Sequence, residues 1–376
     1  MEIYQNLYRK GAWEKDFPAC ELTDLVLILG DITKIYHSRN IEDIKSSFPN
    51  AQVVGCTTAG EVHNGHIYED SISLSALNFN SSRTQSVSAN INPENLKIKA
   101  QELAKQLYNK DLKSIFVIAT GHNINGTELI NGIKDIIPKE ILITGGLAGD
   151  NVNFNKTYVA HNDIICEDLI VLVGFYGEDL IVASGCEGGW TEFGPERVVT
   201  KSNRNVLYSL DGIPALDIYK KYLGDKVNDL PASALLFPLV VKLNNKLITR
   251  TILDIDEKSG AMIFAGDIPE NAKTQFMMAS HNDLIIGAEK SALSAYENID
   301  LKSRTGFLLT ISCVGRKLVL NNYTEDEIEV IKDVFGDNWK SSGFYSYGEL
   351  SPRETGQDCL LQNQTMTISA IGEKYE

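Results

Sequence analysis

Apolar and polar positions follow two periods along this chain, and the period changes several times. Residues 25–29 form a continuous apolar run, which is typical of a strand buried on both faces. Residues 40–48 follow with apolar side chains at helical spacing, and residues 51–55 form a second apolar run that ends at a glycine. Residues 71–77 alternate strictly, so we expect a strand with one exposed face. The pattern predicts a unit of strand, helix, strand, glycine loop and strand.

The same order of elements returns later in the chain. The loop around Gly55 is matched by a second small-residue loop around Gly145, 90 positions further on. Downstream of the two loops the offset grows to 98, which an insertion of about eight residues in the second loop explains. We therefore predict that the N-terminal part is an internal duplication, with copies at about residues 25–80 and 115–177.

Beyond residue 222 the β-rich runs become shorter and more frequent. Residues 234–243 and 247–255 flank a short polar turn at 244–246, which predicts a hairpin. Further expected elements are helices at 95–108, 215–223, 284–296 and 325–334 and strands at 180–184, 261–265, 275–279, 306–313 and 365–371. We predict a two-domain mixed α/β protein, with the duplication in residues 1–222 and more antiparallel sheet in residues 223–376.

Charge, hydropathy and cysteine usage exclude several classes of partner. The net charge is −15 and no cluster of Lys or Arg interrupts it, which argues against a nucleic-acid partner. The apolar runs are far shorter than the about 20 residues of a membrane span, and the N-terminus lacks the regions of a signal peptide. The six cysteines contain no CxxC pair, which argues against disulfides and structural zinc. We therefore expect a cytoplasmic protein with no metal and no membrane span.

The two glycine loops are the first candidate site. A glycine loop after a buried strand frees backbone N–H groups that can converge on a carboxylate or phosphate. The candidate loop residues are Gly55, Cys56, Thr57, Thr58, Gly60, Gly145 and Gly146. Glu61 and Asp150 directly follow the last glycine of each loop, and a carboxylate there can hold an ammonium group. Two alternatives stay open: the glycines only permit close packing, and the carboxylates cap helices or face water.

Cys56 offers an alternative, catalytic use of the first loop. It lies on a strand-to-loop turn beside two threonines, a position similar to a nucleophile elbow. A cysteine nucleophile needs a histidine base, and the nearby His63 and His66 are surrounded by turn residues. The second copy has Gly146 in this place, so the repeat does not need a thiol. We expect a buried cysteine and no enzyme, with a cysteine hydrolase as an alternative.

Several motifs together resemble one family. Residues 55–61, GCTTAGE, resemble the glycine-cysteine-serine/threonine box of FIST sensory domains. Further stretches that resemble family motifs, in the family's order, are residues 188–191, 199–202, 210–219, 312–316, 343–349 and 363–366. The resemblance implies an intracellular signal-transduction module, with N- and C-terminal parts, that binds small molecules such as amino acids. It also implies a signalling partner, such as a histidine kinase or chemoreceptor, and leaves the oligomeric state open.

Two arginines are candidates in the C-terminal half. Arg316 follows the expected strand 306–313 at a strand-to-loop exit, where a guanidinium can grip a ligand carboxylate with two hydrogen bonds. The alternative is a structural or surface ion pair. Arg250 lies within the predicted hairpin, and we expect it to form a structural ion pair.

Aromatic and polar residues complete the candidate set. Trp190 and Tyr347 are expected as pocket walls, with a domain-interface core as the alternative. Glu349 and Asn363 belong to the C-terminal stretches that resemble the family's signature. Before Asn363 many family members have histidine, but this chain has Gln362, so no role for an imidazole is inferred there.

The prediction is a non-enzymatic sensory protein that binds a small polar ligand, an amino acid or related carboxylate, between its α/β halves. The expected contacts are Gly55, Cys56, Thr57, Thr58, Gly60, Glu61, Gly145, Gly146, Asp150, Trp190, Arg316, Tyr347, Glu349 and Asn363. No cofactor is expected. Because some proteins that resemble FIST domains are haem-dependent nitric oxide sensors, haem is the alternative, and it would need an axial histidine. His63 and His66 lack a third ligand for a metal.

Overall fold

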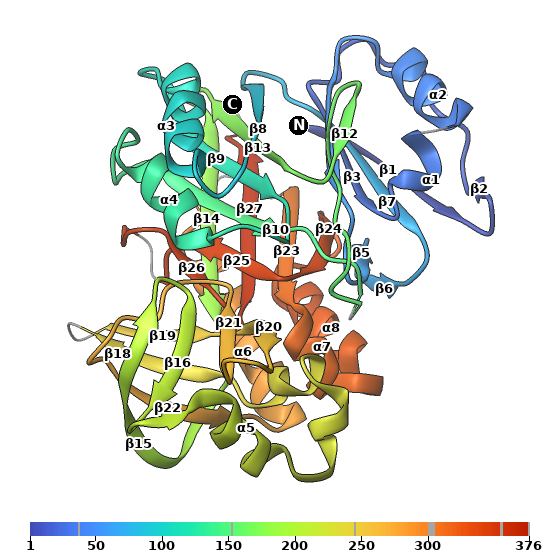
Figure 1. Ribbon diagram of the computed structural model, residues 1–376. Helices are drawn as coiled ribbons and strands as arrows, with labels where there is room; N and C mark the ends of the chain where they lie inside the picture. Colours follow the sequence, from blue (N-terminus) through green and yellow to red (C-terminus); the bar gives the residue numbers. More distant parts are fainter. Residues whose placement is uncertain (37, 152, 244–245, 300–304, 354–355, 375–376) are drawn as a thin grey trace.

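A computed structural model describes residues 1–36, 38–151, 153–243, 246–299, 305–353 and 356–374. Within these residues the strands pair into four sheets. Three of the sheets share one strand order and lie around a common centre, with helices on the outside (Figure 1). The fourth sheet belongs to a separate β-rich domain, drawn in yellow and green at the bottom of Figure 1. The predicted mixed α/β class is confirmed.

The first copy of the repeated unit contains the expected strand, helix, strand, loop and strand. Its elements are β1 (Glu2–Arg9), β2 (Ala12–Trp13), β3 (Leu25–Gly30), α1 (Thr33–Tyr36), α2 (Arg39–Ser47), β4 (Gln52–Cys56), β5 (Glu61–His63), β6 (His66–Tyr68) and β7 (Ile72–Asn78). Strands β3 and β4 are parallel, and β7 is antiparallel to β3. Helix α2 buries Ile41 and Ile44 at the predicted spacing.

The second copy has the same topology, so the predicted duplication is confirmed. Its elements are β8 (Arg83–Asn90), α3 (Leu96–Leu107), β9 (Leu112–Ala119), α4 (Gly126–Lys134), β10 (Leu142–Leu147), β11 (Val159–His161), β12 (Ile164–Cys166) and β13 (Leu169–Tyr176). Strands β9 and β10 are parallel, and β13 is antiparallel to β9. Gly55 lies opposite Ile28, and Gly145 lies opposite Val117, at equivalent places in the two strand pairs.

A third copy, which the sequence pattern did not predict, lies in the C-terminal half. Its elements are β14 (Leu180–Glu187), α6 (His281–Glu297), β23 (Gly306–Cys313), α7 (Val314–Leu320), η3 (Asn321–Tyr323), α8 (Thr324–Phe335), β24 (Trp339–Ser346), β25 (Gly348–Ser351), β26 (Leu360–Gln362) and β27 (Met366–Glu373). Strands β23 and β24 are parallel, β27 is antiparallel to β23, and Gly343 lies opposite Thr310. Gly343 is therefore the third equivalent of Gly55.

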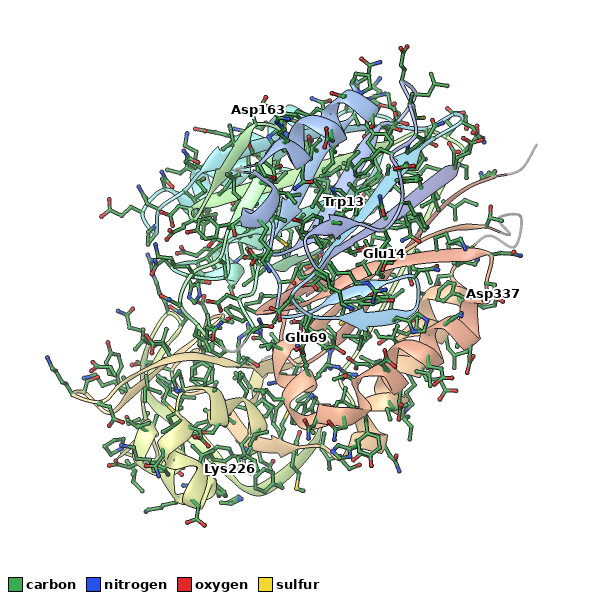
Figure 2. The ribbon with its side chains drawn as sticks, turned by 90° about the vertical axis from the view of Figure 1, so that its right-hand side faces the viewer. Trp13, Glu14, Glu69, Asp163, Lys226 and Asp337 are labelled. Atoms are coloured by element: carbon green, nitrogen blue, oxygen red, sulfur yellow. The ribbon has the colours of Figure 1, made fainter. Side chains whose placement is uncertain are left out.

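The three copies exchange their hairpins in a cycle. Hairpin β5–β6 of the first copy pairs with β24 of the third, and β25–β26 of the third pairs with β10 of the second. Hairpin β11–β12 of the second copy pairs with β4 of the first and closes the cycle. Figure 2 shows Glu69, just after β6, beside the helices of the third copy, where it pairs with Lys317 at 2.6 Å. Each sheet is completed by another copy.

The β-rich domain is inserted into the third copy between β14 and α6. Its elements are β15 (Thr191–Asn203), β16 (Val206–Leu210), β17 (Ile213–Pro214), α5 (Ala215–Leu223), η1 (Gly224–Asp229), η2 (Ala232–Leu236), β18 (Leu239–Leu243), β19 (Lys246–Arg250), β20 (Ile252–Asp256), β21 (Ala261–Phe264) and β22 (Lys273–Met278). It has its own apolar core around α5, which includes Tyr219 and Phe276. The predicted division at residue 222 stays a prediction, and strands from both sides of it share sheets.

Two local predictions differ from the structure. Strand β7 was expected to expose one face, but its serines are buried between sheets, where Ser73 Oγ lies 3.1 Å from Ser342 Oγ. Serine pairs of this kind make a buried face look polar in the sequence. Residues 232–236 form η2, so the expected strand from residue 234 begins only at β18. Part of the predicted turn at 244–246 lies outside the described residues.

The common core lies where the three sheets face one another. One apolar cluster contains Leu27 from β3, Ile118 from β9 and Ile311 from β23, together with Phe344 from β24. Because each sheet buries one face here and the other under its own helices, β3, β9, β13 and β23 are almost continuously apolar. This arrangement brings the three glycine loops together at one end of the core.

Candidate functional site

The loops that follow β4, β10 and β24 are joined by a ring of backbone hydrogen bonds. Gly149 N donates to Thr57 O at 3.0 Å, and Ala59 N donates to Tyr345 O at 2.8 Å. Tyr347 N donates to Leu147 O at 3.2 Å and closes the ring. In each case the donor lies four residues after its own copy's equivalent of Gly55. The acceptor lies two residues after the equivalent glycine of another copy. The ring fixes the positions of the side chains that the three loops carry.

The Glu61 carboxyl and two hydroxyl groups form a buried hydrogen-bonded cluster beside the first loop, which we call the clasp. The Glu61 side chain accepts hydrogen bonds from the Thr58 hydroxyl at 2.5 Å and from the Ser71 hydroxyl at 2.5 Å. Burial raises the pKa of the Glu61 carboxyl to about 7, although the two hydroxyls and Lys317 act in the opposite direction. Glu61 can therefore change its charge near neutral pH. The clasp residue Ser71 was not among the predicted site residues.

Glu349 is held by the same clasp in the third copy. Its carboxyl accepts hydrogen bonds from the Ser346 hydroxyl at 2.6 Å and from the Thr365 hydroxyl at 2.9 Å and amide at 3.1 Å. Burial again raises the pKa of this carboxyl to about 7. Glu349 is fully buried, so it cannot contact a ligand in solvent as the predicted site required. The shared sequence G-x4-G-E, at residues 55–61 and 343–349, was the signal for this equivalence.

The second copy has lost the clasp. Val159 pairs with Cys56, the residue after Gly55, and Glu61 pairs with Phe344, the residue after Gly343. Val159 is therefore the counterpart of Glu61. The two hydroxyl positions are taken by Ala148 and Leu169, and all three residues lie in the common apolar core. This corrects the expected equivalence of Asp150 and Glu61. The reason is the predicted insertion. It lies between Gly149 and Tyr158, the residue before Val159.

Asp150 anchors the inserted loop. Its carboxylate accepts hydrogen bonds from the backbone N–H groups of Phe154 at 3.0 Å, Asn155 at 2.8 Å and Lys156 at 2.9 Å. It also accepts a short hydrogen bond from the Tyr347 hydroxyl. A carboxylate with this many donors is already satisfied, so the expected ammonium contact is replaced by a structural role.

A pocket of about 210 Å³ opens between the first loop and the inserted loop. We call it the loop pocket, and its lining residues are Asp31, Thr33, Thr57, Thr58, Glu61, Asp70, Asp150, Asn151, Asn153, Lys156 and Tyr158. Four of them, Thr57, Thr58, Glu61 and Asp150, belong to the predicted site. Carboxylates outnumber the single lysine, and Lys156 is itself paired with Glu167 at 2.7 Å. The lining therefore favours a positively charged group over an anion.

The glycines serve packing and not anion binding. A Cβ on Gly55 would lie 2.2 Å from Ile28 O, and a Cβ on Gly145 would lie 2.1 Å from Val117 O. A Cβ on Gly146 would lie 2.9 Å from side-chain atoms of Ile311 and Phe344. Gly60 has φ +130°, and its amide donates to the Thr58 hydroxyl at 3.3 Å. These glycines permit close contact between strands and sheets, which corrects the expectation that their amides face a ligand.

Cys56 is buried at the floor of the first loop. Its side chain is inaccessible, and burial raises the pKa of the thiol far above its ordinary value, with Glu61 adding to the effect. His63 uses Nδ1 to contact the Ser73 hydroxyl at 2.9 Å, and burial lowers its pKa to about 4. His66 is exposed, and it is the direct strand partner of His63 across the β5–β6 turn. The geometry lacks the thiolate and the adjacent base that a cysteine nucleophile needs.

Arg316 lies in the protein interior, which corrects its expected role as a ligand contact. Its guanidinium donates to Glu327 from Nε at 3.1 Å and from Nη2 at 2.8 Å. Nη2 also donates to Leu284 O at 2.9 Å, and Nη1 donates to Gly188 O. All three guanidinium nitrogens donate to groups inside the protein, and the side chain is fully buried, so a ligand carboxylate has no access to it. Arg250 is also buried, but it donates to backbone carbonyls instead of forming the expected ion pair.

The remaining predicted residues lie between the third copy and its neighbours. Trp190 Nε1 donates to Gln364 O at 2.8 Å, and Tyr347 stacks on Phe154 with ring centroids 4.6 Å apart. Asn363 is buried, and its Oδ1 accepts from Thr251 N at 3.2 Å while its Nδ2 has no partner among the described residues. For Trp190 and Tyr347 these contacts fit the alternative expectation of a domain-interface core, and the ligand role of Asn363 stays a prediction.

The described residues contain no group of three or more His, Cys, Asp or Glu side chains arranged to hold a metal ion. None of the helices in the described ranges combines the length and apolarity that crossing a membrane requires.

The buried clasps predict a pH-dependent stability. Because burial raises the Glu349 pKa, the folded state binds its proton more tightly than the unfolded state does. This stabilisation is complete below the ordinary pKa and is lost as pH rises to about 7, by up to about 3 kcal/mol. The unfolding free energy of wild type relative to Glu349→Gln, measured in urea, is expected to fall between pH 5 and pH 8. Glu325→Gln, on the surface of α8, is the control. A wild-type advantage independent of pH would contradict the clasp.

Comparisons with known proteins agree with this description. The chain matches the FIST N domain over residues 24–213 and the FIST C domain over residues 215–352. An uncharacterized protein from Methanocaldococcus jannaschii is 24% identical over 364 residues, covering 82% of this chain and 66% of that protein. The chain thus spans slightly less than two thirds of that relative. Among solved structures, PurLQS from Thermotoga maritima matches over 78% of this chain and 72% of its own, with 9% identity. Its TM-score of 0.22 is too low to support an argument.

Proposed function

The chain belongs to the FIST family, whose domains are sensory domains of signal transduction, and on that premise we propose that it is a non-enzymatic sensor of a small ammonium-bearing ligand. The ligand class is an amino acid or a related small molecule. The ligand binds in the loop pocket, between the first and second copies, and not in a cleft between the N- and C-terminal halves, which was the sequence prediction.

The loop pocket supports this proposal through the placement of its charges. The carboxyl groups of Glu61, Asp31 and Asp70 are among its lining groups. The threonine and asparagine side chains of the lining supply further hydrogen-bond partners of the kind that orient a small polar ligand. Lys156 is exposed, and among the described residues its ion-pair partner is Glu167, which it can exchange for a ligand carboxylate. The acidic surplus makes the ammonium group the main recognition element.

The inserted loop supports the sensory part of the proposal. Asp150, Asn151, Asn153, Lys156 and Tyr158 form one side of the pocket, and the Asp150 carboxylate accepts hydrogen bonds from the amides of Phe154 and Asn155 in the same loop. A ligand that contacts both Glu61 and this loop stabilises one arrangement of the first two copies, which is how binding without catalysis can transmit a signal. The partner that reads this arrangement is a histidine kinase or chemoreceptor, as the family suggests. We place the protein in the cytoplasm, where its six free cysteines stay reduced.

The test uses ligands that separate the two charged groups of an amino acid. A thermal-shift screen of amino acids, simple amines and matched carboxylates is followed by calorimetry on the best binder. We expect compounds with an ammonium group to bind and carboxylates without one to fail. Glu61→Gln is expected to weaken binding about 10- to 100-fold, because a charge-assisted hydrogen bond contributes about 1.5–3 kcal/mol. Binding to wild type is expected to weaken from pH 8 to pH 6, as Glu61 gains its proton.

Glu349→Gln is the matched control, because Glu349 has the same clasp but does not line the loop pocket. It should leave ligand affinity unchanged. Equal losses in both variants would assign the effect to stability and not to contact. If no amine or amino acid binds while the protein as purified shows a Soret band, haem sensing replaces this proposal.

A further inference from the structure

A second pocket, of about 280 Å³, lies between the second copy and the β-rich domain. We call this domain, which is inserted between β14 and α6, the β-domain. We call the pocket itself the domain pocket. Its walls come from the segment that follows β9 and leads into α4, from Phe154 of the inserted loop, and from β-domain residues near Arg204 and Asp254. Figure 1 shows the β-domain below the second copy, with α4 above the ends of its strands. The pocket shares no lining residue with the loop pocket.

The charges of the domain pocket exclude a simple anion site. Arg204 is the only cationic side chain of its lining, and it pairs with Glu128 at 3.2 Å. Asp254 adds a second carboxylate, which accepts a hydrogen bond from Ile255 N at 2.8 Å and has no cationic partner among the described residues. The N-terminal amides of α4 are capped by Asn125, which accepts from Thr127 N and Glu128 N. An uncharged or weakly basic ligand fits this balance.

His122 supplies a polar atom that the protein leaves unused. Its Nε2 is buried and has no hydrogen-bond partner among the described residues. Burial lowers the His122 pKa, although Asp150 and Asp254 act in the opposite direction, so the imidazole is neutral at pH 7. A neutral imidazole offers one donor and one acceptor. Because His122 is one of the lining residues of the domain pocket, a ligand that reaches this nitrogen would give it the partner that buried polar atoms normally have.

A rigid aromatic wall lies beside the imidazole. Phe154 stacks on Tyr347 with an interplanar angle of 16°, and the His122 ring meets Tyr347 edge-on at 5.5 Å. Tyr347 covers one face of Phe154, so a ligand in the pocket meets the other face or the edge. Leu253 adds an apolar contact from the β-domain, and Asn205 adds a side-chain amide. A flat ring with donors and acceptors on its edge matches these walls.

We infer that the domain pocket binds a small uncharged heteroaromatic compound of the nucleobase or nucleoside class. The ring lies against Phe154 and Leu253, a ring nitrogen bonds His122 Nε2, and an exocyclic amino group donates to Asp254. The inference goes beyond the proposed amino-acid sensing and does not depend on it, because the two pockets are lined by different residues.

Adenine and adenosine are the probes, with L-phenylalanine, benzoate and ribose as comparison compounds. Saturation-transfer NMR and calorimetry on the full chain at pH 7.5 should detect the two probes and not ribose or benzoate. Phe154→Leu and His122→Phe should each weaken probe binding by about tenfold or more, because stacking of a base on an aromatic ring contributes about 1–3 kcal/mol. His122→Phe keeps the ring contact with Tyr347, so its effect isolates the nitrogen.

Two further variants guard against a folding artefact. Asp254 is exposed, so Asp254→Asn should leave the melting temperature unchanged and weaken adenosine severalfold. Glu61→Gln, in the loop pocket, should leave adenosine binding unchanged even if the proposed amino-acid binding fails. The inference is overturned if neither probe binds, if L-phenylalanine or benzoate binds better, or if the His122 and Phe154 variants bind adenosine like wild type.

Discussion

Arg316→Met is expected to destabilise the protein by about 3–5 kcal/mol without any ligand present. The guanidinium and the Glu327 carboxylate are both fully buried, so removing the arginine leaves a carboxylate without its counter-charge. Glu327 would keep only the hydroxyls of Ser312 at 2.9 Å and Tyr345 at 2.7 Å. Two backbone carbonyls, of Gly188 and Leu284, would also lose their donor. The measurement is the free energy of unfolding in urea.

A double variant separates the ion pair from simple loss of packing. Arg316→Met with Glu327→Leu removes both charges, and we expect it to be more stable than Arg316→Met alone. Lys99→Met is the control for an exposed pair, because Lys99 and Glu102 pair on the surface of α3 and should contribute less than 1 kcal/mol. A cost below 1 kcal/mol for Arg316→Met would contradict the buried role and reopen a ligand role.

Separating residues 1–222 from residues 223–376 is expected to abolish cooperative folding of the N-terminal fragment. That fragment would lose β25 from the edge of β10 and would expose β5, which pairs with β24. The fragment would also leave β14 without its partner β27. Exposed strand edges and a divided apolar core remove the hydrogen bonds and apolar burial that offset the conformational entropy lost on folding. Thermal unfolding followed by near-ultraviolet circular dichroism should show no sharp transition for the fragment alone.

A circular permutant is the matched control for this cut. The N-terminal amine lies 3.0 Å from the Glu373 carboxylate, so the first residue and the last strand lie close together. A short linker can therefore join them, and new ends can open between Gly177 and Glu178, where the second copy passes to the third. The permutant keeps every strand pairing and should unfold cooperatively. A sharp transition in the isolated fragment 1–222 would contradict the interdependence of the copies.

The sequence predicted the elements of the first two copies well because each period depends on local burial. Helix α5 occurs at the predicted residues 215–223, and α2 and α3 differ from prediction by one residue at each end. The third copy was missed because the β-domain separates β14 from the rest of its copy, although the offset from Val117 to Thr310, 193, is close to that from Gly145 to Gly343, 198. The repeated G-x4-G-E at residues 55–61 and 343–349 was visible, but its meaning depends on strand pairing between distant segments.

The candidate site was predicted only in part for a similar reason. Glu61, Thr57 and Thr58 are neighbours in the chain, so one motif places them together at the loop pocket. Arg316 was assigned to a ligand because its position after a buried strand does not reveal Glu327, which lies on another helix. Asp31 and Lys156 were missed because both are far from Glu61 in the sequence, and only the fold brings all three to the lining of the loop pocket.

The inserted loop of the second copy is a shared wall, and this has a consequence in terms of thermodynamic linkage. Asn151 and Lys156 line the loop pocket, while Phe154 lines the domain pocket, and the Asp150 carboxylate holds the segment between them. Any ligand that shifts this segment in one pocket changes the affinity of the other. By conservation of free energy around the binding cycle, the factor must be the same in both directions. The second copy, which lacks the carboxyl clasp, would then couple the binding affinities of the two ligands.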